Sequence, residues 1–121
     1  MKSNKPQFID SSDLISQMIR RIVETVSPER IILFGSYANG METPDSDIDL
    51  MVIESGEFGP ERSRRKEMAR LWLALKDFAF PKDILVYTND EWEKWRESQN
   101  HIIARASREG RALYERKHPR C

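Results

Sequence analysis

Residues 31–53 read IILFGSYANGMETPDSDIDLMVI, and this stretch decides the fold. Two apolar runs flank a Gly-Ser turn and a polar segment, and the second run is entered through Asp47 and Asp49. In an extended strand, side chains two residues apart point to the same face, so both carboxylates would project together. Adjacent like charges repel unless a cation lies between them. The pair therefore predicts a divalent-metal site, and oxygen ligands without a nearby His or Cys favour Mg²⁺ over Zn²⁺.

Length and charge limit what the chain can be. Its 121 residues suffice for one domain with a real core. Twenty basic residues balance twenty acidic ones, so no overall basic field attracts nucleic acid, and direct nucleic-acid binding is not expected. The single cysteine, Cys121, cannot form an intrachain disulfide, which predicts a reducing cytoplasm. No apolar stretch approaches the roughly 20 residues of a membrane span, so no membrane association is expected.

Helices and strands alternate along the first half of the chain. Apolar spacing predicts a helix over residues 13–26, which Ser27-Pro28 ends. A strand at 30–34, a short helix from Ser36 and a strand at 48–53 follow. We expect residues 1–10 to be a flexible arm that lacks the apolar core of a signal peptide.

The second half continues the alternation. The expected elements are a helix at 60–78, a strand at 83–87, a helix that Thr88 and Glu91 begin with capping-box spacing, a helix at 98–109 that ends at Gly110, and a short strand at 112–114. Such an order indicates an α/β or α+β fold with one central sheet, in which the 60–78 helix connects the second and third strands. We expect the domain to span residues 11–115 and a loose tail to cover 116–121.

A third acid, Asp83, opens the third strand as Asp47 and Asp49 open the second. If these two strands are neighbours, all three carboxylates gather at one edge of the sheet. They could then hold two cations about 3.5–4 Å apart, which clamp the attacking and leaving oxygens of an in-line phosphoryl displacement. The Gly35-Ser36 pair fits the phosphate end, because glycine permits close backbone approach and a helix start offers donors.

These motifs resemble the DNA polymerase β-like nucleotidyltransferase superfamily. GSYANG, SDIDL and the acid in KDILVY carry the resemblance, which covers roughly residues 12–115 and is strongest to the minimal, single-domain (MNT) group, in which Gly-Ser is followed by ten residues and Asp-x-Asp. The resemblance implies a central mixed sheet flanked by helices, with ATP as nucleotide donor and two Mg²⁺ ions.

The resemblance also implies roles for individual residues. Asp47 and Asp49 match the aspartates that bind the catalytic metals. Asp83 matches the third carboxylate, a metal ligand credited with activating the attacking hydroxyl. Gly35 and Ser36 match the pair that holds the nucleotide phosphates.

Members of the minimal group are commonly paired with a HEPN-domain ribonuclease as toxin–antitoxin modules. The resemblance implies an antitoxin that transfers AMP to a tyrosine of the toxin. Because the catalytic core takes up the 121 residues, we expect the acceptor to be held by another molecule or by a second copy. One departure is Asn39, where the family often has an arginine that would lie near the phosphates. It motivates an alternative, a catalytically weak or inactive antitoxin that neutralises its partner by forming a complex. A small-molecule transferase is less favoured, because such relatives carry an added helical domain.

Other signals have plainer interpretations. The basic run of residues 62–66 is interpreted as a solvated helix face, with a docking surface as the alternative. Arg105 and Arg108 are expected to face solvent, and His101 and His118 to be surface or helix residues rather than metal ligands. The tryptophans are expected in the core or in an interface: Trp72, Trp92 and Trp95.

Overall fold

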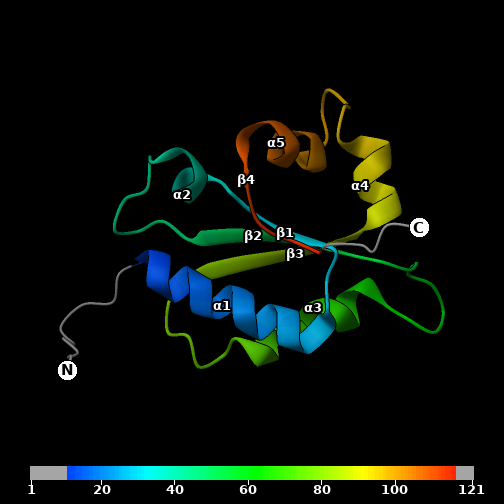
Figure 1. Ribbon diagram of the computed structural model, residues 1–121, viewed down its shortest axis with the longest axis horizontal. Coiled ribbons are helices and arrows are strands. Elements are labelled where there is room, and N and C mark those ends of the chain that lie inside the picture. The colour runs from blue at the N-terminus through cyan, green and yellow to red at the C-terminus, as the bar shows by residue number, and fades with distance from the viewer. Residues whose placement is uncertain (1–10, 117–121) are drawn as a thin grey trace.

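The computed structural model describes residues 11–116 (Figure 1). The expected arm at 1–10 lies outside the described residues, as does the expected tail apart from Arg116. The helices are α1 (Ser11–Val26), α2 (Ser36–Asn39), α3 (Arg64–Ala74), α4 (Asn89–Trp95) and α5 (Ile102–Glu109). The strands are β1 (Arg30–Phe34), β2 (Ile48–Glu54), β3 (Lys82–Thr88) and β4 (Arg111–Glu115).

The strands form one four-stranded sheet in the order β3-β2-β1-β4. β2 and β3 run parallel, while β1 is antiparallel to both β2 and β4. The parallel pair needs a crossover, and α3 supplies it between β2 and β3. The sheet is therefore mixed, and the prediction that the second and third strands are neighbours is confirmed.

Helices cover both faces of the sheet. α1 and α3 lie on one face and α2, α4 and α5 on the other (Figure 1). β2 is the central strand, and its apolar residues are fully buried: Ile48, Leu50, Met51, Val52 and Ile53. Alternate residues serve the two faces, since Leu50 packs in the α1–α3 cluster and Met51 in the cluster of α4 and α5. An apolar strand without alternation is typical of a sheet covered on both sides.

The α3 helix is shorter than the predicted span of 60–78. Gly59 and Arg62 exchange two backbone hydrogen bonds, of 2.8 and 3.1 Å, which hold the preceding segment in a turn. Ser63 then caps the helix, since its hydroxyl accepts from the Lys66 N–H at 3.2 Å. At the other end, a bond from the Phe78 N–H to the Leu75 carbonyl tightens the chain into turns.

The last helix also begins later than predicted, at Ile102 rather than near residue 98. The Nδ1 atom of His101 accepts a hydrogen bond from the Ile103 N–H at 3.1 Å and so caps the helix. His101 also stacks on Trp95, with ring centroids 4.7 Å apart. His101 is therefore the capping residue directly before α5, whereas His118 lies outside the described residues. The short last strand is confirmed and covers Arg111–Glu115.

Trp72 does not lie in the core, which was one of the two positions expected for it. The periodicity of the 60–78 segment places it beside Leu71 and Leu75, which are fully buried, but Trp72 itself is 39% exposed. Lys82 lies over its ring, with Nζ 5.5 Å from the centroid. Trp92 is buried, as predicted for a core residue.

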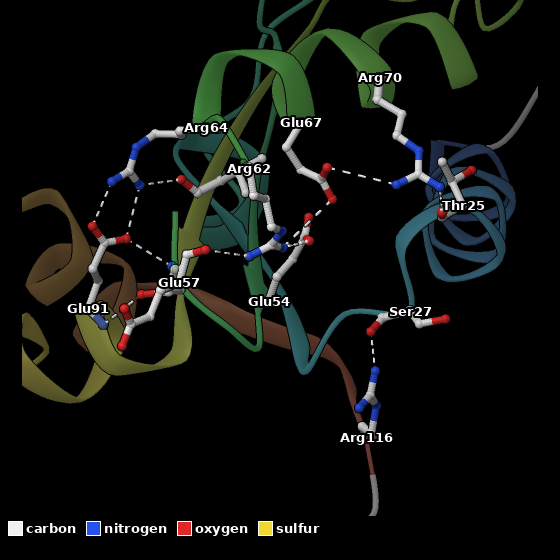
Figure 2. A network of polar contacts seen from close by, with 12 residues as sticks. Thr25, Ser27, Glu54, Glu57, Arg62, Arg64, Glu67, Arg70, Glu91 and Arg116 are labelled. Carbon is white, nitrogen blue, oxygen red and sulfur yellow. Dashed lines mark hydrogen bonds and ion pairs between the residues drawn. The ribbon is translucent and has the colours of Figure 1, made fainter. Parts of the chain in front are cut away.

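The basic run divides into paired and exposed residues. Arg62 donates to the buried Glu54 carboxylate at 2.5 Å, and Arg64 makes two hydrogen bonds to Glu91, at 2.9 and 2.6 Å (Figure 2). The interpretation as a solvated face is therefore wrong for these two arginines, because their partners come from β2 and α4. It is confirmed for Arg65, which is exposed along with Lys66.

Candidate active site

The three aspartates come together at one edge of the sheet. Asp49 and Asp83 are the second residues of β2 and β3, and the parallel register places them directly opposite each other. Neighbouring strands are about 4.8 Å apart, so the two side chains share one face at short range. Asp47 lies just before β2. Asp47 and Asp83 are exposed, and Asp49 is half-buried.

Electrostatics shows that these carboxylates affect one another. Burial raises the pKa of Asp49 most, and the charge of Asp83 and then that of Asp47 raise it further. A cation placed among the three would remove this repulsion, and hard carboxylate oxygens suit Mg²⁺. The donor set therefore fits the predicted metal site.

The three carboxylates lie at the same edge of the sheet, but their oxygens do not converge on one point. Within residues 11–116, no three acidic, His or Cys side chains already stand at metal-binding spacing. Asp47 and Asp83 are exposed, so their side chains have room to change rotamer and meet a shared cation.

Gly35 packs against the Asp49 carboxylate. Its φ of 77° lies in the region that favours glycine, and a Cβ built there would lie 2.3 Å from the Asp49 Oδ2. The sequence suggested glycine here for close approach to a phosphate. The structure adds a second reason, because any side chain would push the carboxylate away.

Ser36 begins α2, directly after this glycine. The Gly35 carbonyl accepts from the Ala38 N–H at 3.0 Å, and Gly40 ends the helix in the left-handed conformation with φ 75°. Tyr37 packs edge-to-face on Phe80, with ring centroids 6.1 Å apart. The expected strand, Gly-Ser turn and short helix are all present.

Asn39 stabilises its own turn. Its side chain is exposed, and its Oδ1 accepts a hydrogen bond from the Met41 N–H at 3.1 Å. The position where the family often has an arginine therefore brings no cation to the α2 side of the site.

A cavity of about 230 Å³ lies beside these residues, between the end of β1 and α5. Its lining joins the site to the last helix: Phe34, Gly35, Asp49, Ile102, Arg105 and Glu109. Arg105 is exposed, as predicted, but its place beside Asp49 was not predicted. The sequence signal that could have suggested it is the helical spacing of Ile102, Arg105 and Glu109, which puts the three residues on one face. A larger cavity of about 440 Å³, lined in part by Tyr37, Glu42 and Arg111, includes none of the three aspartates.

Comparison with known proteins identifies the family of the chain. The nucleotidyltransferase domain family matches residues 15–108, so the chain belongs to that family. A solved structure of a candidate nucleotidyltransferase from Sulfolobus solfataricus is similar at 16% identity and a TM-score of 0.61, covering 93% of this chain and 94% of that one. A solved toxin–antitoxin structure with AMP-PNP is similar at 20% identity and a TM-score of 0.50, covering 84% of this chain and 73% of that one. No curated protein matches the chain.

The predicted polymerase β-like nucleotidyltransferase fold is thereby confirmed, and the protein is assigned to the transferase class. The roles of the individual site residues stay predictions. No helix among residues 11–116 has the length and apolar character to cross a membrane.

Proposed function

We propose that this protein is a Mg²⁺-dependent nucleotidyltransferase that moves AMP from ATP to a hydroxyl of a partner protein. The observation that carries the proposal is the edge where Asp49 and Asp83 face each other in register, with Gly35 packed on the Asp49 carboxylate. We further propose that the partner is a HEPN-type toxin, that the acceptor is one of its tyrosines, and that the pair works in the cytoplasm. The similarity to a toxin–antitoxin structure with AMP-PNP supports this assignment.

The proposed chemistry is an in-line displacement at the α-phosphorus. Asp47, Asp49 and Asp83 would hold two Mg²⁺ ions, which supply charge neutralisation at the attacking and leaving oxygens. Asp83, exposed at the strand edge, would also accept the proton of the acceptor hydroxyl. The hydroxyl oxygen bonds to the α-phosphorus, the bond from that phosphorus to the bridging oxygen breaks, and pyrophosphate leaves.

The phosphate end of the site is assigned to the turn between β1 and α2. There Gly35 would let the backbone approach the nucleotide, and Ser36 would offer its hydroxyl and amide. Asp49 must be ionised to bind a metal, and its raised pKa makes that form less favourable in the absence of a cation. Metal binding is therefore expected to weaken as pH falls, because protons compete with the cation for Asp49.

The test is to incubate the protein with ATP, Mg²⁺ and a candidate HEPN partner and to measure the partner's intact mass. We expect one or more added AMP units, and their loss in Asp47→Asn. Asp45→Asn is the matched control, since Asp45 is an exposed acid of the same loop and lies outside the strand edge. Absence of added mass with the wild-type protein, or equal mass with Asp47→Asn, would contradict the proposal.

The alternative is a binding module that neutralises its partner by complex formation alone. Asn39 favours it, because its side chain is engaged by the Met41 N–H and leaves the α2 turn without a cation. This alternative predicts that Asp49→Asn, while folded and bound to the partner, still protects cells that express the partner. Loss of protection with complex formation intact would favour the enzyme.

A further inference from the structure

We propose that Arg105, on α5, binds the triphosphate of the nucleotide in the cavity that Gly35 and Asp49 also line. This inference rests on the proposed function and names a residue of the same site. It starts from the lining of the cavity, in which β1, β2 and α5 each contribute side chains.

The cavity is lined by two acidic residues and one basic residue. Asp49 and Glu109 are acidic, and among the described residues that line this cavity Arg105 is the one with a positive charge. A triphosphate would enter a region where acids already repel one another, so it needs cations from the protein as well as from metals. A guanidinium suits this need, because its planar fork can donate two parallel hydrogen bonds to one phosphate.

The Arg105 side chain is accessible to a ligand. The Arg105 side chain is 70% exposed, and its ion pair with Glu109 is long, at 3.8 Å. Exposed pairs of this kind contribute little to stability, so a ligand can displace the contact easily. The guanidinium is therefore free to turn from Glu109 towards a bound phosphate.

The helix that carries Arg105 is nevertheless fixed. Ile103 and Ala104, the two residues before Arg105, are fully buried, and the Gly110 that ends α5 packs tightly on β1. A Cβ at Gly110 would lie 2.7 Å from the Ile32 Cγ2. The backbone of Arg105 is thus held in place while its long side chain can adjust.

Other cations near the site are engaged elsewhere. Lys82 adjoins Asp83, but its Nζ donates to the Phe78 carbonyl at 2.9 Å and lies over Trp72. Arg111 lines the larger cavity. The α2 turn offers no cation, because Asn39 stands there. The charge that would meet the phosphates therefore comes from α5.

The test is the affinity of the full chain for AMP-PNP in Mg²⁺, measured by titration calorimetry at two salt concentrations. Arg105→Gln should weaken binding by about tenfold or more and make it less sensitive to salt. Arg105→Lys should retain part of the affinity, because it keeps the charge but not the fork. Glu109→Gln should tighten binding, since it removes both the competing partner and a negative charge.

Arg108→Gln is the matched control. It removes the same charge from the same helix, and Arg108 lies outside the cavity lining, with a 3.5 Å contact to the Ser98 carbonyl. Equal affinity of Arg105→Gln and Arg108→Gln, with both folded by circular dichroism, would overturn the role of Arg105 and leave the proposed function standing. Failure of the wild-type protein to bind AMP-PNP at all would overturn both.

Discussion

The two ends of β2 hold acids in opposite ways. At its end, Glu54 is buried and ion-paired with Arg62, while Glu91 nearby is held by Arg64 (Figure 2). At its start, Asp49 lies beside Asp47 and Asp83, and among residues 11–116 no ion pair reaches any of the three. Arginines pair with the acids at the end of this strand. Acids left to repel one another cost stability, which points to a functional role.

The largest effect should follow from disturbing the start of β2, where Asp49 lies beside Asp47 and Asp83. Gly35→Ala would force its Cβ to within 2.3 Å of the Asp49 Oδ2, so the carboxylate must move. We expect nucleotidyl transfer to fall by about 100-fold, because a small misplacement of a reacting group is costly.

Gly40→Ala is the matched control for this variant. Its φ of 75° is also positive, but its ψ of 15° lies in the left-handed helical region, which other residues tolerate better than the ψ of −158° at Gly35, and its Cβ would meet nothing within 4 Å. Gly40→Ala should lose about 1–2 kcal/mol of unfolding free energy and Gly35→Ala more, and only Gly35→Ala should lose most of its transfer rate. Equal rates in the two variants would mean that contact with Asp49 is unimportant.

Substitutions at the end of β2, where Arg62 pairs with Glu54, should change stability rather than activity. At pH 8.5, where Glu54 is ionised, Arg62→Ala leaves the buried Glu54 carboxylate without its cation, so we expect a loss of about 2–4 kcal/mol in unfolding free energy by urea denaturation. Arg65→Ala, an exposed member of the same basic run, should change it by less than about 0.5 kcal/mol. Similar losses for both would show that the pairing of Arg62 is dispensable.

Glu54 should also make stability depend on pH. Burial, reinforced by Glu67 and opposed by Arg62, raises the pKa of Glu54 from 4.5 to about 8. Between these values the folded protein binds the proton more tightly than the unfolded chain does, so the contribution of Glu54 to stability falls as pH rises from about 5 to 8. Urea denaturation at pH 5.5 and 8.5 should show this decline in the wild-type protein and a smaller one in Glu54→Gln. An equal decline in both would assign it to other groups.

The smallest expected effect is a gain in stability from a substitution at the start of β2. Asp49→Asn removes a half-buried charge that Asp83 and Asp47 repel, so unfolding free energy at pH 7 should rise. Solvent screens this repulsion, and we expect a gain of only about 0.5 kcal/mol. Loss of stability in this variant would show that the carboxylate supports the fold instead.

The same two ends separate what sequence reasoning could predict from what it could not. Asp47, Asp49 and Asp83 could be placed at one edge because they open two apolar strands joined by a crossover helix. The pairs of Arg62 with Glu54 and of Arg64 with Glu91 could not, because they depend on how α3 lies over the strand ends. These partners are 8 and 27 residues apart in the chain, and nothing local marks them.

Helix ends were the least predictable feature of the fold. Ser63 and His101 begin helices three or four residues later than the apolar periodicity suggested, because their side chains cap the exposed N–H groups. The position of Arg105 beside Asp49 was not predicted, for a related reason. Its place beside Asp49 follows from the packing of α5 on β1, which the sequence of α5 does not show.

Catalysis at the start of β2 is tested by the intact mass of a HEPN-type partner after incubation with ATP and Mg²⁺. The comparison needs one variant from each end of β2: Asp49→Asn, which alters the proposed site, and Glu54→Gln, which alters the paired acids. We predict that wild-type protein and Glu54→Gln add AMP to the partner and that Asp49→Asn does not. Addition of AMP by Asp49→Asn at the wild-type rate would contradict the assignment of catalysis to this edge of the sheet.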